Sequence, residues 1–144
     1  NGIKARVEHL VERFGLSEYA DARIERLSTG MKQKVAIART VAHDPMVVIL
    51  DEPTNGLDIL NVLDFHRLMR ELQQAGKTVL FSTHTMSEAE KLCDRIAIIH
   101  RGRILACGTL EELREASGKH YLEDIFVCVL ESHGEVTEAV VESP

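Results

Sequence analysis

The spacing of apolar residues predicts a largely helical start to the chain. Residues 3–14 repeat apolar side chains at helical intervals: Ile3, Val7, Leu10, Val11 and Phe14. Gly15 ends this predicted helix, and residues 16–24 are expected to form a turn and a short helix. A second amphipathic pattern runs over residues 31–42. We therefore expect residues 1–42 to form a helical segment.

The middle of the chain alternates between a strand, a helix and a second strand. Residues 46–50 are a short apolar run rich in β-branched side chains, which predicts a strand buried on both faces. Residues 60–74 carry apolar side chains in a helical rhythm, and Gly76 stands where a helix-ending glycine is common. Residues 78–82 form the next apolar run. Because a strand–helix–strand unit is a crossover, we expect the two strands to be parallel.

A hairpin and further helices are expected downstream. Residues 95–100 and 103–107 are predicted to be strands joined by a tight turn, which gives an antiparallel hairpin. Ser87 is expected to cap a short helix before this hairpin, and Thr109 with Glu112 forms a capping box after it. The predicted fold class is α/β, with a parallel βαβ core, a C-terminal antiparallel hairpin and flanking helices.

The last residues divide into a helix and an acidic tail. Residues 121–131 have a helical pattern, although several of their side chains are β-branched. Residues 132–144 are acidic and end in Pro144, which is typical of a disordered tail.

Composition narrows the function classes. The net charge is −6, which argues against a nucleic-acid-binding surface. The apolar runs are too short to cross a bilayer, so any link to a membrane is expected to come through a partner. The three cysteines form no Cys-x-x-Cys pair, so we expect a reducing compartment such as the cytoplasm.

Two acids, Asp51 and Glu52, directly follow the first predicted strand. Ligands of open α/β sheets bind at the carboxyl ends of the strands. One acid could hold Mg²⁺, and the other could orient a water for attack on phosphorus. For a pair of acids taken alone, the alternative is a solvated acidic turn.

An anion-binding helix start and a strand-end histidine accompany the acids. Ser28 is a good N-cap for the second helix, and Gly30 allows a ligand to approach the backbone closely. Free N–H groups at such a helix start attract anions. His84 follows the second predicted strand. His84 could contact a ligand at this edge of the sheet; the alternative is a polar strand-end residue without a ligand.

These segments, in this order, resemble the C-terminal part of an ATP-binding-cassette (ABC) transporter ATPase, over about residues 1–116. The matching motifs are the signature loop (27–31), the Walker B strand (47–52), the D-loop (55–58) and the switch histidine (82–84). The signature departs from the common form at Thr29 and Met31, a variant that resembles prokaryotic export-type subunits. It keeps Ser28 and Gly30, so phosphate contact is still expected.

The resemblance implies a partial P-loop NTPase-like sheet in an ABC-type nucleotide-binding domain over residues 1–131. The expected parts are a helical segment with the signature (1–42), the Walker B strand to the C-terminal helix (43–116), a last helix (117–131) and the tail (132–144).

The resemblance also implies ATP and Mg²⁺ as cofactors. Asp51 would help to hold Mg²⁺, Glu52 would polarise the attacking water, and His84 would contact the γ-phosphate. The residues that would contact nucleotide on a second ABC subunit, in a head-to-tail dimer, are Ser28, Thr29, Gly30 and Asp58. The other expected partner is a membrane-spanning transporter subunit, with the ATPase in the cytoplasm at the inner face of the membrane. No nucleic acid is expected.

No Gly-x-x-x-x-Gly-Lys-[Ser/Thr] phosphate loop occurs in the sequence. We expect the chain to be a piece of a longer ATP-hydrolysing subunit, to be inactive alone, and to self-associate through uncovered core surfaces. Two alternatives are a separate lobe of a split ABC-type ATPase and a non-enzymatic assembly lobe. Residues 102–113, which resemble transporter subunits, favour the first interpretation.

Overall fold

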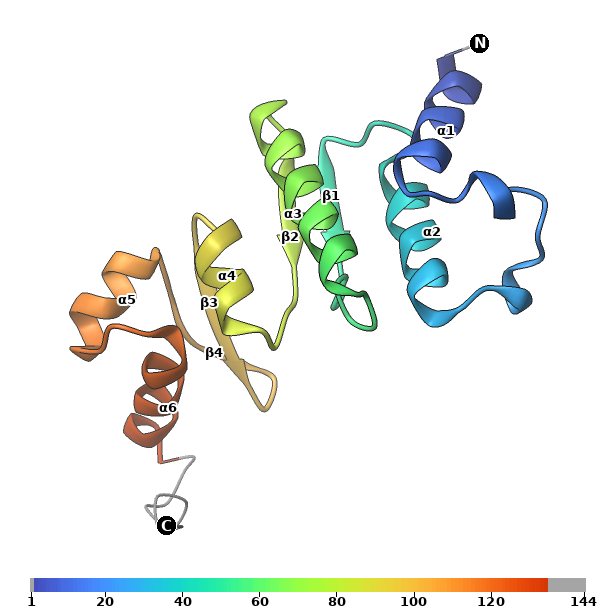
Figure 1. Ribbon diagram of the computed structural model, residues 1–144. Coiled ribbons are helices and arrows are strands. Elements are labelled where there is room, and N and C mark those ends of the chain that lie inside the picture. Colours follow the sequence, from blue (N-terminus) through green and yellow to red (C-terminus); the bar gives the residue numbers. More distant parts are fainter. Residues whose placement is uncertain (1, 135–144) are drawn as a thin grey trace. The chain divides into compact units, whose positions relative to one another are not determined.

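The chain forms an α/β structure, as predicted, in a computed structural model that describes residues 2–134. It divides into two compact units, Asn1–His84 and Thr85–Pro144. Figure 1 shows the order of helices and strands along the chain. The signature loop, the Walker B strand, the D-loop and the switch histidine all lie in the first unit.

Two helices open the first unit. Helix α1 spans Gly2–Arg13 and is followed by Gly15, whose φ of 62° is left-handed. Helix α2 spans Thr29–Val41, and the Ser28 side chain accepts a hydrogen bond from the Met31 N–H at its start. The N-cap prediction is therefore confirmed, and this helix begins two residues earlier than expected. Between the helices lie two 3₁₀ turns, Ser17–Tyr19 and Ile24–Arg26.

A parallel strand pair forms the core of the first unit, as the crossover pattern predicts. Strand β1 (Val47–Leu50) pairs in register with strand β2 (Thr78–Phe81), and helix α3 (Ile59–Gln74) connects them. In Figure 1, α3 lies alongside the two strands. Phe65 of α3 is fully buried, and its ring meets the ring of Phe81 edge-on at a centroid distance of 6.2 Å. This contact fixes the helix on one face of the strand pair.

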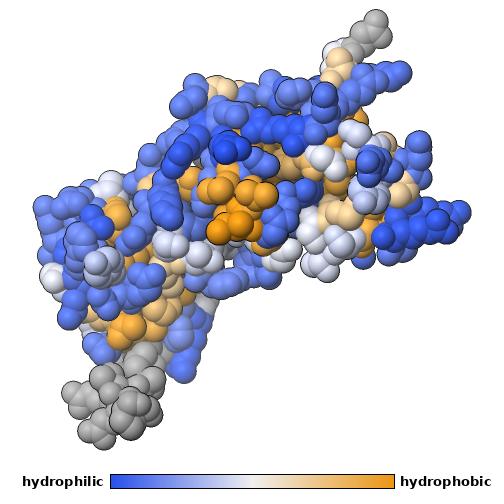
Figure 2. All heavy atoms as spheres, in the orientation of Figure 1, coloured by the Kyte–Doolittle hydropathy of each residue, from blue (hydrophilic) through white to orange (hydrophobic). Residues whose placement is uncertain are grey.

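The opposite face of the strand pair is bare, so the prediction of a strand buried on both faces is wrong. Val47 is 56% exposed, Ile49 is 67% exposed and Leu80 is 61% exposed. The register pairs Ile49 with Leu80, so their side chains share this face. No element within residues 2–134 covers them. Apolar side chains also reach the surface in patches on the face drawn in Figure 2. Self-association through such a face stays a prediction, which sedimentation at micromolar concentration can test.

The second unit packs three helices around a hairpin. Helix α4 (Met86–Leu92) precedes strands β3 (Ile96–His100) and β4 (Arg103–Gly108), which pair antiparallel with a bulge between Ile98 and Ile99. Helices α5 (Leu110–Ser117) and α6 (Leu122–Ser132) complete the unit. Its buried core consists of Ala89, Ile96, Ile98, Leu113, Leu122 and Ile125.

The helix starts of the second unit confirm one predicted cap and overturn another. The capping box is present, because Thr109 accepts from the Glu112 N–H and Glu112 accepts from the Thr109 N–H. Helix α4, in contrast, has Thr85 rather than Ser87 at its N-cap, without a side-chain capping bond. The helix begins at Met86, so Ser87 lies inside its first turn. Ser132 ends α6, and the rest of the predicted tail from 135 lies outside the described residues.

Candidate functional site

The two acids and the strand-end residues meet at one edge of the parallel strand pair. Asp51 directly follows β1, and Ser82 directly follows β2, so register places them side by side. The Ser82 hydroxyl donates to Oδ1 of Asp51. The Ser82 hydroxyl oxygen in turn accepts from the Glu52 N–H at 2.9 Å. The carboxyl edge of the pair therefore forms one connected polar cluster, as the sequence predicts for an α/β site.

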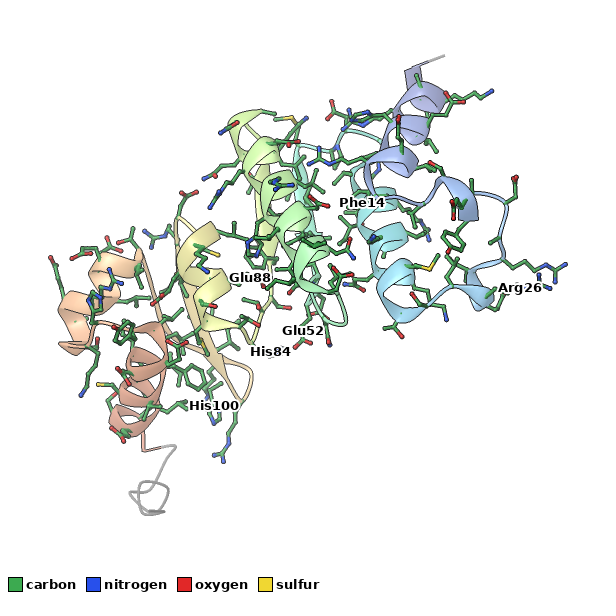
Figure 3. All side chains as sticks on the ribbon, in the orientation of Figure 1. Phe14, Arg26, Glu52, His84, Glu88 and His100 are labelled. Atoms are coloured by element: carbon green, nitrogen blue, oxygen red, sulfur yellow. The ribbon has the colours of Figure 1, made fainter. Side chains whose placement is uncertain are left out.

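Glu52 is held in an unusual backbone conformation. Its φ is 41°, in the left-handed region that a side chain with a Cβ rarely occupies. Its carboxylate contacts two residues: Nδ1 of His84 lies 3.4 Å from Oε1, and Nδ2 of Asn55 donates to Oε2 at 3.2 Å. Its backbone carbonyl accepts from Nε2 of Gln33 at 3.2 Å. Figure 3 shows Glu52 and His84 near each other at this edge.

The Glu52–His84 pair is open to solvent. The Glu52 side chain is 45% exposed and the His84 side chain is 72% exposed. A water can therefore reach the carboxylate from outside, with an imidazole beside it. A carboxylate in that position can accept a proton from water, and an imidazole can donate to a bound oxyanion.

The neighbouring oxygens suit a hard cation but do not enclose one. Asp51 offers a carboxylate and Ser82 a hydroxyl in contact with it. Within residues 2–134, no group of three or more His, Cys, Asp or Glu side chains could hold a metal ion together. This donor set fits Mg²⁺, which proteins commonly bind through one or two carboxylates together with water and substrate phosphates.

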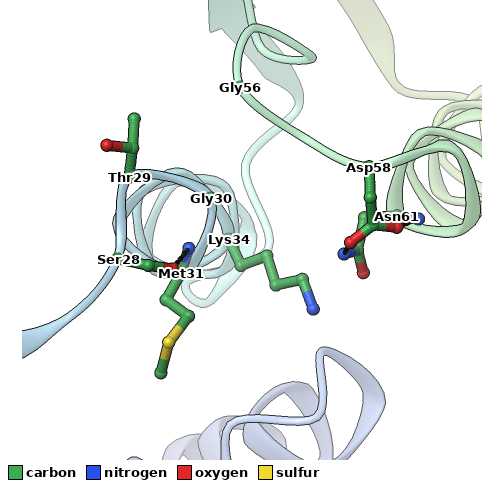
Figure 4. Close-up of a pocket in the computed structure, with 8 residues that line it drawn as sticks. All are labelled: Ser28, Thr29, Gly30, Met31, Lys34, Gly56, Asp58 and Asn61. Atoms are coloured by element: carbon green, nitrogen blue, oxygen red, sulfur yellow. Dashed lines mark hydrogen bonds between the residues drawn. The ribbon is translucent and has the colours of Figure 1, made fainter.

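A separate pocket lies where α2 begins and α3 begins. It has a volume of about 470 Å³ and is drawn in Figure 4; its lining residues are Ser28, Thr29, Gly30, Met31, Lys34, Gly56, Asp58 and Asn61. The structure thus brings together all four residues expected to contact a second subunit's nucleotide. Glu52 is not among the residues that line this pocket.

Two glycines allow the walls of this pocket to approach each other. A Cβ on Gly30 would lie 3.1 Å from the Gly56 carbonyl oxygen. A Cβ on Gly56, whose φ is 75°, would lie 3.3 Å from Cγ2 of Thr29. Side chains at these positions would force the signature loop and the D-loop apart.

Asp58 is the N-cap of α3 as well as a wall of the pocket. It accepts from the Asn61 N–H at 3.0 Å and from the Asn61 side-chain amide. The backbone hydrogen bond from Asn61 is the main cause that lowers the pKa of the Asp58 carboxyl from its usual value. The Asn61 side chain and the nearby Lys34 charge act in the same direction. Asp58 is therefore a fixed negative charge in the pocket.

Sequence reasoning missed the residues that support the predicted ones. Asn55 and Ser82 were seen only as parts of motifs, and Gln33 was not singled out. Asn55 could have been found, because a turn brings residues three apart together. Ser82 could have been found from its register next to the end of β1. No sequence signal indicates that Gln33 reaches Glu52.

The comparisons with known proteins agree with these motifs. The family described as "ABC transporter" matches residues 1–55. The "ABC transporter ATP-binding protein NatA" of Bacillus subtilis (strain 168) is 44% identical over 89% of this chain and 52% of the relative. "Nod factor export ATP-binding protein I" of Burkholderia orbicola (strain AU 1054) is 43% identical over 78% of this chain and 37% of the relative.

A solved structure extends the match to three dimensions. "Structure of ATP binding subunit of ABC transporter" superposes with a TM-score of 0.83 at 34% identity, over 89% of this chain and 54% of that chain. This chain spans about half the length of NatA and of the solved subunit.

Proposed function

Because the chain belongs to the family of ABC transporter ATP-binding proteins, we propose that it supplies half of the machinery with which a complete subunit hydrolyses ATP. The chain contributes the groups that act on the attacking water and a surface that contacts nucleotide on a second subunit. A phosphate-binding loop is expected from the remainder of the subunit, since a P-loop supplies most contacts to the β- and γ-phosphates.

The placement of Glu52 beside His84 carries this proposal. Glu52 accepts the proton of the attacking water, and Nδ1 of His84 at 3.4 Å keeps that carboxylate aimed. The exposed His84 imidazole would contact the γ-phosphate. Asp51 would hold Mg²⁺, which neutralises phosphate charge when bound.

The pocket at the start of α2 supports a second, complementary role. Ser28, Thr29 and Gly30 present the backbone N–H groups of a helix start, and Lys34 adds a positive charge to the same lining. We assign this pocket to the γ-phosphate held by a partner subunit in a head-to-tail dimer, with Asp58 reaching across the interface. Each dimer would then contain two composite sites.

The same proposal assigns the energy of hydrolysis to transport. No helix in the described part of the chain is long and apolar enough to cross a membrane. We assign the transport path to a membrane-spanning partner, with this subunit at the cytoplasmic face. The likeness to subunits named for export favours an exporter.

A glutamate substitution tests the catalytic assignment. In a complete subunit that contains this chain, Glu52→Gln should bind ATP normally and hydrolyse it about 100-fold more slowly, because the amide cannot accept the proton. Glu115→Gln is the matched control, since Glu115 is exposed on α5 in the second unit. Unchanged turnover of Glu52→Gln would remove Glu52 from this role.

Calorimetry tests whether the chain alone suffices. We expect the 144-residue chain to bind Mg-ATP weakly or not at all, because its sequence contains no phosphate loop. Binding in the low micromolar range would mean that the chain forms a nucleotide site by itself, and the division of labour proposed here would fail.

A further inference from the structure

Gln33 connects the helix that begins with the signature loop to the backbone of the proposed catalytic acid. It lies on α2, close to the helix start that lines the pocket. Its side-chain amide donates to the Glu52 carbonyl oxygen at 3.2 Å, and this bond is partly buried. Nineteen positions separate the two residues in the chain. The contact is therefore tertiary and joins two different motifs.

Glu52 needs external support to keep its conformation. A left-handed φ such as its 41° costs of the order of 1 kcal/mol or more for a residue with a Cβ. Its peptide groups are held on both sides. Ser82 accepts from its N–H, and its carbonyl oxygen accepts from both the Gln33 side chain and the Asn55 N–H. If one of these bonds is lost, the peptide can relax, and the direction of the carboxylate changes with it.

The residues on either side of Gln33 do not share this contact. The Lys34 ammonium donates to the Phe14 carbonyl oxygen at 3.1 Å, so it points back towards α1. Lys32 is exposed on the helix surface. Gln33 is therefore the residue of this helical turn that reaches the Glu52 backbone.

We propose that Gln33 is a positioning residue that holds the Glu52 peptide in its left-handed conformation, and so keeps the carboxylate aimed beside His84. This role rests on the proposed function of Glu52. Because Gln33 shares α2 with Thr29 and Gly30 of the pocket, we expect a shift of this helix start to be transmitted to Glu52. In this role Gln33 acts through the Glu52 peptide and not directly on the water or the phosphate.

Three substitutions at this position separate positioning from packing. Gln33→Met keeps the length of the side chain but removes the donor. Gln33→Glu keeps the shape and places a carboxylate oxygen against the carbonyl. Gln33→Lys restores an N–H donor of sufficient reach. In the complete subunit, we expect Gln33→Met to lower kcat about 10-fold and Gln33→Glu to lower it further, with KM for ATP unchanged, since a displaced catalytic group costs rate rather than binding.

The lysine variant and a neighbouring control make the result specific. Gln33→Lys should recover at least half of the lost kcat, whereas a role in packing alone would give no such recovery. Lys32→Met, one position away on the exposed surface of the same helix, should leave kcat unchanged. Equal kcat for Gln33→Met and the wild type, or failure of Gln33→Lys to recover any activity, would overturn the assignment.

A double-mutant cycle separates this inference from the proposed function. In a Glu52→Gln background, Gln33→Met should lower single-turnover hydrolysis by less than 2-fold, because both changes act through the same carboxylate. If Glu52→Gln itself leaves hydrolysis unchanged, the proposed function fails. If Glu52→Gln is inactive but Gln33→Met retains full activity, only the role of Gln33 fails.

Discussion

The Glu52 cluster and the signature pocket are built in different ways, although both lie in the first unit. In the cluster, side chains contact side chains: Glu52 meets His84 and Asn55, and Ser82 meets Asp51. The pocket, in contrast, is formed mainly by backbone groups: the start of α2, and two glycines that lie close to the opposite wall. The cluster should therefore respond to changes of functional group, and the pocket to changes of volume and backbone conformation.

The strongest test of the cluster is the pairing of Glu52 with His84. In the complete subunit, His84→Ala should slow hydrolysis about 100-fold, because the variant loses the imidazole that lies beside the Glu52 carboxylate and is proposed to contact the γ-phosphate. Combined with Glu52→Gln, the loss should be far from additive, since both side chains act on one water and one phosphate. Single-turnover rates of the four proteins measure this coupling. Losses that multiply independently would mean that the 3.4 Å contact has no catalytic meaning.

The sequence predicted features that depend on neighbours along the chain. Ser28 and Thr109 were identified as N-caps, and Gly76 as a helix-ending residue, because such motifs are decided within about four residues. The parallel pairing of β1 with β2 also followed, since a crossover between adjacent strands fixes their direction. The motif residues at the strand ends therefore arrived at one edge as expected.

Features that depend on distant parts of the structure were not predicted. An apolar run indicates that a strand can be buried, but not which of its faces is covered. The burial predicted for Ile49 was therefore wrong, because its side chain is exposed. The contact of Gln33 with the Glu52 carbonyl depends on how α2 packs against the turn after β1. A polar residue in an amphipathic helix gives no indication of such a partner.

The pocket should be most sensitive to an added methyl group at Gly56. Gly56→Ala is expected to destabilise the chain by about 2 kcal/mol, because a left-handed residue acquires a Cβ. That Cβ would also lie 3.3 Å from the Thr29 side chain. Gly102→Ala is the matched control: its φ of 73° is similar, but nothing lies within 4 Å of the new Cβ. Urea unfolding of both variants isolates the contact, and equal losses would mean that the two walls can separate freely.

Substitution of two N-cap residues, Ser28 in the pocket and Thr109 in the second unit, is expected to cause a smaller loss of stability. Ser28→Ala should cost about 1 kcal/mol of stability through the lost bond to the Met31 N–H, which is 3.2 Å long. Thr109→Ala should cost a similar amount, because it removes one half of the capping box. In the complete subunit, however, only Ser28→Ala should also weaken ATP-dependent dimerisation, which analytical ultracentrifugation measures. Equal effects of both variants on dimerisation would remove the pocket from the proposed interface.

The smallest expected effect is a pH dependence from Asp58. The bond from the Asn61 N–H lowers the pKa of this carboxyl below its usual 3.8. A lowered native pKa means that the ionised form stabilises the fold: the contribution is complete above pH 3.8 and is lost as the pH falls through the native value. Asp58→Asn keeps an N-cap at neutral pH, so its stability there should be nearly unchanged while its loss of stability below pH 4 becomes shallower. Asp44, whose pKa is lowered chiefly by Lys77, remains in the variant and preserves part of the slope.

Urea titrations between pH 3 and pH 7, with Asp21→Asn on an exposed turn as the control, would show this difference. An acid slope identical to that of the wild type would mean that Asp58 does not hold α3 in the way its contacts indicate, and the pocket would lose the fixed negative charge assigned to it.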